Sequence, residues 1–399
     1  MRLLIVGFSH SIHVARWIAQ IADQGWDVHL FPSIDFGITH PNLRDITIHH
    51  SVYKKQKVAG SNVRFRGIRL PHESPAAVLR LALKREMPRY RLNQLRRLIR
   101  SLKPDIIHSM EMQSGAYLTL EAKKTFSDSF PPWLVTNWGS DIYLFGRLKE
   151  HEPKIREVLA ACDYYSCECD RDVTLARSFG FKGSILPVFP NAGGFEMDIV
   201  SRLREPGPCS ARRLIMMKGY QGWAGRALVG LRALERCADL LRGYTIAIYS
   251  ASTEVEIAAE LFTGATGVET VIIPKGTPHN EILSLHGRSR ISIGLSIGDA
   301  LSTSFLEALV MGAFPIQSWT SGAGEWIEHG KTAMLVPPDD SEGVEQAIRI
   351  ALTDDRLVDQ ASEINFLLAK ERLDHGKIKS MAIDIYRSIA SGSTRICQK

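Results

Sequence analysis

Two carboxylates with a fixed spacing, Asp299 and Glu307, stand out in the second half of the chain. The apolar, β-branched run 291–297 just before them is typical of a buried strand, and the residues after them predict a helix. Gly312 is placed to end that helix. Three consecutive residues are able to cap its start: Ser302, Thr303 and Ser304.

A strand that ends in a turn of small residues and continues into a helix directs several free backbone N–H groups at one point. The positive end of the helix dipole lies at the same point, which therefore suits a phosphate. Carboxylates repel a diphosphate, so Asp299 and Glu307 are better suited to accept hydrogen bonds from sugar hydroxyls on either side of it.

The segment 299–315 resembles the signature of the retaining nucleotide-sugar glycosyltransferases of the GT-B fold. In that family two Glu residues separated by seven residues lie between a strand and a helix, and Asp299 and Glu307 have this spacing with Asp in the first place. The resemblance implies that Asp299 contacts the transferred sugar and that Glu307 contacts the ribose of the nucleotide. It also implies an α/β fold of two Rossmann-like domains that face each other across a cleft.

The overall composition fits a globular protein that handles anions. The chain has 399 residues, enough for two domains with sizeable cores. Its net charge of +6 fits a phosphate ligand, an anionic membrane surface or simple solubility. The basic stretch 84–103 predicts a helix after Pro88 whose apolar side serves either a packed core or a membrane surface. No nucleic-acid-binding motif accompanies this charge, so we expect no nucleic acid as a partner.

The cysteines and the apolar runs bear on the cellular compartment. The six cysteines lack the paired spacing of a disulfide scaffold or a zinc knuckle. The first strand is too short for a signal peptide, and no stretch approaches the length of a membrane span. We therefore expect a cytoplasmic protein, with peripheral contact to the inner face of the cell membrane as the alternative that the basic stretch leaves open.

One strand–helix–strand pattern occurs twice along the chain. It begins at residue 2 and starts again at residue 212, after a break rich in Pro and Gly. This repetition is what two Rossmann-like domains require. We predict an N-terminal acceptor-side domain at 1–190, a linker at 191–211, a nucleotide-sugar-binding domain at 212–370, and a C-terminal helix at 371–399 that, by resemblance, returns to the first domain.

Polar residues after the predicted strands of the first domain are candidates for acceptor-side or catalytic roles. His10 and His13 follow the first strand, where open α/β sheets bind ligands, although both also fit helix-start histidines that face water. His108 lies in a segment similar to the family motif Asp-x-x-His-x-His, with Met110 at the second histidine. It is therefore either a catalytic residue or a satisfied loop histidine. Three further residues resemble a segment that lines the family's cleft: Gly139, Ser140 and Asp141.

Cations follow two predicted strands of the second domain. Lys218 and Arg226 lie in the Gly-rich loop at its start, and by resemblance they hold the diphosphate; the alternative is surface charge beside a turn. Fixed cations stabilise a leaving diphosphate without a metal. Lys275 ends a strand where the family binds the base. Asp170 and Asp172 have the spacing of a manganese motif, but acids in a first helical turn need no metal to explain them, so we expect no metal and no cofactor.

The sequence thus predicts a retaining glycosyltransferase with a catalytic group of His108, Lys218, Arg226 and Asp299. Its substrates would be a nucleotide-diphosphate sugar, UDP-linked in preference to GDP-linked, and the hydroxyl of a sugar, a glycan or a lipid-linked sugar. Synthesis of a cell-envelope polysaccharide or glycolipid is the expected setting. Two alternatives stay open: a nucleotide-sugar epimerase of the same fold, and a catalytically silent nucleotide-sugar-binding protein.

Overall fold

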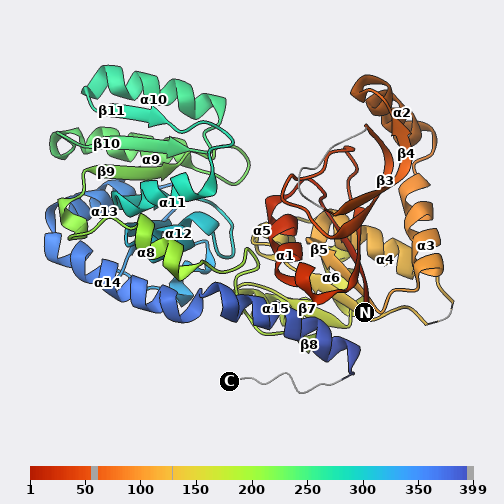
Figure 1. Cartoon of the computed structure of the whole chain (residues 1–399). Helices are drawn as coiled ribbons and strands as arrows, with labels where there is room; N and C mark the ends of the chain where they lie inside the picture. The colour runs from red at the N-terminus through yellow and green to blue at the C-terminus, as the bar shows by residue number, and fades with distance from the viewer. Residues whose placement is uncertain (55–61, 128, 393–399) are drawn as a thin grey trace. The chain divides into compact units, whose positions relative to one another are not determined.

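A computed structural model describes residues 1–54, 62–127 and 129–392. The chain forms two compact units. Unit 1 comprises Met1–Gly193 and Gly376–Lys399, and unit 2 comprises Gly194–His375. Each unit is built on a parallel β-sheet that is covered by helices (Figure 1).

The sheet of unit 1 has eight parallel strands in the order β4-β3-β2-β1-β5-β6-β7-β8. The chain order reverses between β1 and β5, and this is the point where ligands bind in open α/β sheets. The strands are β1 (Arg2–Gly7), β2 (Asp27–Pro32), β3 (Ile46–Lys54), β4 (Val63–Leu70), β5 (Ile106–Met110), β6 (Trp133–Thr136), β7 (Tyr164–Ser166) and β8 (Ser184–Ile185).

Helices cover both faces of this sheet because its central strands are apolar on both sides. Side chains alternate along a strand, so Leu3 and Ile5 of β1 pack in one core cluster and Leu4 and Val6 in another. The first cluster includes α1 and α15, and the second includes α3, α4 and α6. The helices are α1 (Ile12–Ile21), α2 (Glu73–Glu86), α3 (Tyr90–Leu102), α4 (Tyr117–Lys123), α5 (Ser140–Tyr143), α6 (Glu152–Ala161), α7 (Asp170–Ser178) and α15 (His375–Ala390).

The sheet of unit 2 has six parallel strands in the order β11-β10-β9-β12-β13-β14. This is the Rossmann order, with its reversal between β9 and β12. The strands are β9 (Leu214–Lys218), β10 (Thr245–Tyr249), β11 (Glu269–Ile272), β12 (Ser289–Gly294), β13 (Phe314–Ser318) and β14 (Met334–Val336). The helices are α8 (Met197–Leu203), α9 (Ala227–Arg236), α10 (Thr253–Thr266), α11 (His279–Gly287), α12 (Thr303–Met311), α13 (Ser341–Thr353) and α14 (Asp355–Arg372).

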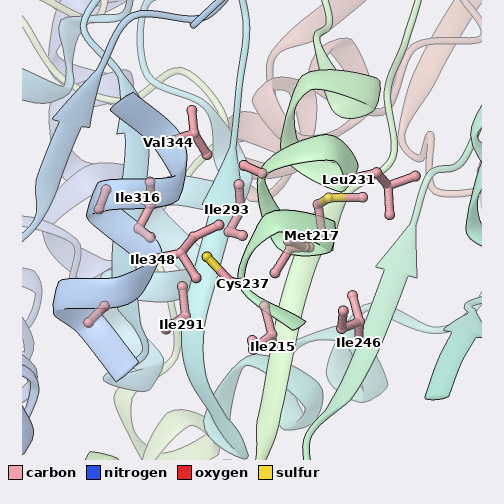
Figure 2. Packing of buried hydrophobic residues seen from close by; sticks show 14 of the residues in the cluster. Ile215, Met217, Leu231, Cys237, Ile246, Ile291, Ile293, Ile316, Val344 and Ile348 are labelled. Carbon is pink, nitrogen blue, oxygen red and sulfur yellow. The ribbon is translucent and has the colours of Figure 1, made fainter. Parts of the chain in front are cut away.

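The core of unit 2 fixes the two strands that flank its reversal. Figure 2 shows Ile215 of β9 and Ile293 of β12 packed beneath Leu231 of α9 and Ile348 of α13. All four side chains are at most 4% exposed. Burial of each such side chain stabilises the folded state by about 1.5–3 kcal/mol. The ends of β9 and β12 are therefore held in place relative to each other.

The elements around the central motif agree with the sequence prediction. Helix α12 begins after Ser302, and Gly312 ends it with a left-handed φ of 75°. Other elements were not expected. Helix α2 occupies a stretch for which no helix was predicted, and residues 191–211, expected as a linker, include α8, whose Val200 is buried in a core cluster of unit 2.

The cysteines and the helix lengths complete the description. All five cysteines at described positions are buried free thiols, and Cys397 lies outside the described residues. Across the described ranges, none of the helices combines the length and the apolar character needed to cross a membrane.

Candidate active site

The loops after β9 and β12 lie side by side at the reversal of the unit 2 sheet. Gly225 and Ser296 form an isolated antiparallel bridge, and the Ile297 N–H donates to the Ala224 carbonyl at 2.9 Å. The Gly-rich loop that follows β9 and the small-residue turn that follows β12 therefore form one surface at the carboxyl edge of the sheet.

A lysine reaches the start of α12 on this surface. The Lys218 ammonium, at the end of β9, donates to Ser302 Oγ at 3.3 Å, and that oxygen lies 2.6 Å from Ser304 Oγ. The Ser302 side chain makes no capping hydrogen bond to the helix, which begins at Thr303. The Phe305 N–H donates to the Ser302 carbonyl at 2.9 Å, so the N–H groups of Thr303 and Ser304 are the ones that suit an anion beside the Lys218 ammonium.

Arg226 has a different partner from the one predicted. Its guanidinium, 21% exposed, pairs through Nε with Asp339, which follows β14, and NH1 donates to the Gly225 carbonyl at 2.8 Å. Asp339 is 64% exposed, and such surface pairs contribute at most about 1 kcal/mol. Arg226 therefore lies in the same Gly-rich loop, but its guanidinium pairs with Asp339 and is not directed at the start of α12.

Lys275 does not lie at the point where the strand order of the unit 2 sheet reverses. It is exposed in the turn after β11, and β10 separates that strand from β9. Two strand spacings amount to about 10 Å. The structure therefore brings Lys218 together with the start of α12 and leaves Lys275 to one side.

Asp299 lies in the turn before α12, close to the Gly-rich loop. Partial burial raises the pKa of Tyr220 in that loop, and the Asp299 carboxylate raises it further. Tyr220, which the sequence analysis did not select, is therefore a second polar group beside Asp299.

Glu307 is buried between two histidines. It is 4% exposed, and its Oε1 accepts a hydrogen bond from His279 Nε2 at 2.7 Å while Oε2 lies 3.5 Å from His286 Nε2. Burial alone would raise the pKa of Glu307, but the hydrogen bonds and charges of the two histidines lower it to about 2. The carboxylate is ionised at neutral pH and is held in one orientation.

The histidines around Glu307 belong to an element that the sequence analysis did not predict. Both lie on α11, where the His279 side chain is 40% exposed and His286 is fully buried. His286 packs edge-on against Tyr249 with ring centroids 5.6 Å apart. Burial, followed by the charge of Glu307, raises the pKa of Tyr249. The sequence signals for α11 are modest: Pro278 at the N-cap, Glu281 in the first turn and His286 in the last.

The equivalent edge of unit 1 carries aromatic rings. The ring centroid of His10 lies 5.3 Å from that of Phe36, and the ring centroid of His13 lies 5.4 Å from that of Trp138. Phe8, directly after β1, lies 6.1 Å from Trp138. The two candidate histidines are thus members of one aromatic cluster at the reversal of the sheet, and partial burial lowers the pKa of His10.

Asp141 connects two loops of unit 1. Its Oδ2 accepts hydrogen bonds from the Trp138 N–H at 2.8 Å and the Met112 N–H at 3.0 Å. Burial and then the charge of Glu111 raise the pKa of Asp141, and burial also raises the pKa of Glu111. The other two residues of the predicted segment frame α5: Gly139 precedes the helix and Ser140 begins it. Asp141 therefore has a structural role, because it holds the loops that contain Met112 and Trp138 together.

His108 is a satisfied core histidine. It is fully buried, with Nδ1 2.7 Å from the Tyr386 hydroxyl and Nε2 2.6 Å from Thr136 Oγ1. Trp17 Nε1 donates to the same Tyr386 hydroxyl, and both ring nitrogens of His108 have partners within the core of unit 1. Burial lowers the pKa of His108 to about 3. The structure thus corrects the expectation of a catalytic contact in favour of the alternative left open above.

The acidic pair of α7 is accounted for without a ligand. Asp172 is fully buried and accepts hydrogen bonds from Asn137 Nδ2 at 2.7 Å and Arg171 Nε at 2.9 Å. Asp170 begins the helix, where a carboxylate stabilises the positive end of the dipole. Among residues 1–54, 62–127 and 129–392, no group of three or more His, Cys, Asp or Glu is arranged to hold a metal ion.

Two segments match known protein families. Residues 75–165 match the family described as Glycosyl transferase 4-like, and residues 259–366 match Glycosyl transferases group 1. No curated protein sequence matches the chain.

Solved structures with this fold extend over nearly the whole chain. Sucrose-phosphate synthase from Thermosynechococcus elongatus has a TM-score of 0.69 at 15% identity, covering 98% of this chain and 100% of its own. HepE from Anabaena, in complex with UDP and glucose, has a TM-score of 0.68 at 12% identity, covering 97% and 100%. Trehalose 6-phosphate synthase from Burkholderia multivorans has a TM-score of 0.65 at 13% identity, covering 100% and 99%.

Two Rossmann-like units, each with a ligand-binding reversal in its sheet, define the GT-B class of fold, to which these similar structures also belong. The family matches then specify the kind of protein: the chain is a GT-B glycosyltransferase. Its group 1 segment includes Glu307 and the start of α12.

Proposed function

We propose that the protein transfers a sugar from a UDP-sugar to a hydroxyl acceptor with retention of the anomeric configuration. One observation carries the proposal: Lys218 and the uncapped start of α12 meet at the reversal of the unit 2 sheet. A similar structure, HepE, binds UDP and glucose, which supports UDP as the nucleotide.

Each group in unit 2 then has a role in the proposed reaction. Lys218 and the N–H groups of α12 stabilise the negative charge that develops on the leaving diphosphate, and Arg226 exchanges Asp339 for the same diphosphate. Asp299 accepts hydrogen bonds from the hydroxyls of the transferred sugar. Glu307, already ionised, accepts them from the ribose.

The bond changes follow from these positions. The bond between the anomeric carbon and the phosphate oxygen breaks, and the acceptor oxygen attacks the same face of the sugar. The acceptor hydroxyl gives its proton to the departing phosphate oxygen. Because Lys218 and the helix start already neutralise the diphosphate, we propose that the reaction needs no divalent metal.

The setting is part of the same proposal. The acceptor is a sugar, a glycan or a lipid-linked sugar, and the product belongs to a cell-envelope polysaccharide or glycolipid. Buried free thiols suit a reducing compartment, so we place the protein in the cytoplasm, with peripheral contact to the membrane.

Titration calorimetry of UDP and GDP, followed by turnover of the matching sugar nucleotide, tests this function. We expect UDP to bind more tightly than GDP, and EDTA to leave turnover unchanged. Complete loss of turnover in EDTA that manganese restores would overturn the metal-free reaction. Conversion of the donor to an epimer without acceptor would support the epimerase alternative, and tight binding of the donor with no product would support the silent binding protein.

A further inference from the structure

Positive charge is concentrated in one segment of unit 1. Residues 63–103 contain twelve Lys and Arg against two Glu, whereas the whole chain has a net charge of only +6. The segment is therefore net +10 and the rest of the chain is net negative. It comprises β4, which is an edge strand, and helices α2 and α3.

Helix α2 covers this edge with one side and exposes apolar side chains on the other. Ala76 is buried, and Arg80 NH1 donates to the Val52 carbonyl of β3 at 3.0 Å, so these residues mark the inner side. On the outer side Val78 is 68% exposed and Leu81 is 67% exposed. Two large apolar side chains one turn apart mark an interaction site only where they belong to a larger apolar patch.

A loop after β2 exposes three more apolar side chains. Ile34, Phe36 and Ile38 are 42%, 49% and 54% exposed, and they alternate with inward-facing residues. The inward Asp35 carboxylate accepts hydrogen bonds from His50 Nδ1 and Ser51 Oγ, both at 2.6 Å. These hydrogen bonds fix the backbone of the loop at Asp35. The apolar side chains on either side of Asp35 are therefore held in an outward orientation.

The loop, α2 and the edge strand form one surface. An added Cβ on Gly37 would meet Arg80 of α2 and the Val52 carbonyl, and Val52 is paired in register with Ile68 of β4, which is 45% exposed. We call this surface the α2 face. Basic residues lie on it or at its border, all of them exposed: Arg64, Arg66, Arg69, Lys84, Arg85 and Arg89.

Helix α3 lacks such an apolar surface. Its Leu95 and Ile99 are buried in the core of unit 1. The apolar side of the basic helix predicted within 84–103 therefore packs in the core. If this segment contacts a membrane, α2 is the helix whose apolar side chains are exposed to do so.

We propose that the α2 face binds the anionic surface of a lipid bilayer. Apolar side chains enter the headgroup region while Lys and Arg contact anionic lipids, each adding up to about fivefold in affinity. A second copy of the chain is a poorer partner because it would bring the same basic segment against itself. The inference deepens the membrane contact of the proposed function and rests on it.

Unit 2 offers an internal control. Helix α10 exposes Ile257 (57%) and Leu261 (69%), also one turn apart, but Glu254, Glu256 and Glu260 surround them. The exposed fractions of these apolar side chains are similar to those on α2, while the charge around them is opposite. Only the α2 pair should therefore respond to anionic lipid.

Co-sedimentation of the full chain with vesicles tests the inference, using phosphatidylcholine with and without phosphatidylglycerol. We expect binding to the anionic vesicles, with affinity reduced at least about tenfold by Val78→Ser/Leu81→Ser and about 20-fold by Lys84→Gln/Arg85→Gln. Ile257→Ser/Leu261→Ser should change nothing. Circular dichroism establishes that each variant is folded.

Three results would overturn the proposal: no binding of the wild-type chain to anionic vesicles, equal effects of the α2 and α10 pairs, or a homodimer that dissociates in Val78→Ser/Leu81→Ser. UDP titration without vesicles is the separate test of the donor site. Normal UDP binding without vesicle binding rejects the α2 face alone, and vesicle binding without UDP binding rejects the donor site alone.

Discussion

The two sheet edges of this protein have the same topology and different chemistry. In unit 2, the reversal between β9 and β12 brings Lys218 to small hydroxyl residues and a helix start. In unit 1, the reversal between β1 and β5 brings His10 and His13 to aromatic rings. Topology therefore fixes where a ligand binds, and the side chains decide that one edge suits an anion and the other an apolar or ring-shaped surface.

The carboxylates at the two edges differ in the same way. Glu307 is buried next to two histidines, which lower its pKa to about 2 in spite of burial. Glu111 and Asp141 are buried close to each other, and burial raises the pKa of both. A buried carboxylate stays ionised, and so ready to accept a ligand's hydrogen bonds, where the hydrogen bonds and charges of its neighbours offset its desolvation.

The difference between the two sheet edges predicts that substitution of Lys218 has the largest effect on donor turnover. We expect Lys218→Ala to lower donor turnover by about 10²–10³-fold, because a fixed cation at the developing charge is removed. Lys275→Ala is the matched control, since that exposed lysine lies two strands away. Steady-state kinetics with the UDP-sugar measures both variants, and equal losses would show that the cationic edge does not act where we place it.

The second effect separates the two predicted carboxylates. Glu307→Ala removes a charge-assisted hydrogen bond to the ribose, worth about 1.5–3 kcal/mol, so UDP should bind about 10- to 150-fold more weakly. Asp299→Ala should leave UDP affinity nearly intact and lower turnover, because its partner is the sugar. Calorimetry on both variants measures this, and equal losses of UDP affinity would contradict the division of roles.

The sequence predicted the parts of the site that depend on local signals. The strand–turn–helix pattern located the start of α12, although Ser302 makes no capping hydrogen bond there, and the resemblance to the family placed Lys218 at the diphosphate. The α/β class and the two Rossmann-like units followed from the same periodicity.

Partners far apart in the chain could not be predicted. Arg226 pairs with Asp339, which is 113 positions away, and His108 bonds to Tyr386, which is 278 positions away. Neither pair has a spacing that a sequence displays. Helix α2 was missed because most of its residues face solvent and give no sustained apolar stripe, so periodicity does not reveal it.

The third effect tests the buried histidine of unit 1. His108→Leu should remove the partner of Thr136 Oγ1 and one of the two partners of the Tyr386 hydroxyl, which keeps its bond from Trp17, at a cost of about 1–3 kcal/mol in the free energy of unfolding. UDP affinity, which depends on unit 2, should stay unchanged. Urea denaturation and calorimetry measure the two quantities. Unaltered stability combined with lost turnover would restore a catalytic role for His108.

The smallest effect concerns the pH dependence of Glu307. Its pKa in the folded protein, about 2, lies below its ordinary value of 4.5, so the stabilisation that it contributes is present above pH 4.5 and is lost as the pH falls toward 2. His279→Gln removes the imidazole that bonds to Oε1 and helps to lower the pKa of Glu307, so it should raise that folded pKa and the acid loss of stability begins at higher pH. Because the His279 side chain is 40% exposed, we expect a difference of about 1 kcal/mol or less near neutral pH. Urea denaturation from pH 7 to pH 3 measures the shift, with His375→Gln, on another exposed histidine beside a carboxylate, as the control. Identical acid profiles for His279→Gln and the wild-type chain would mean that the buried His286 alone keeps Glu307 ionised.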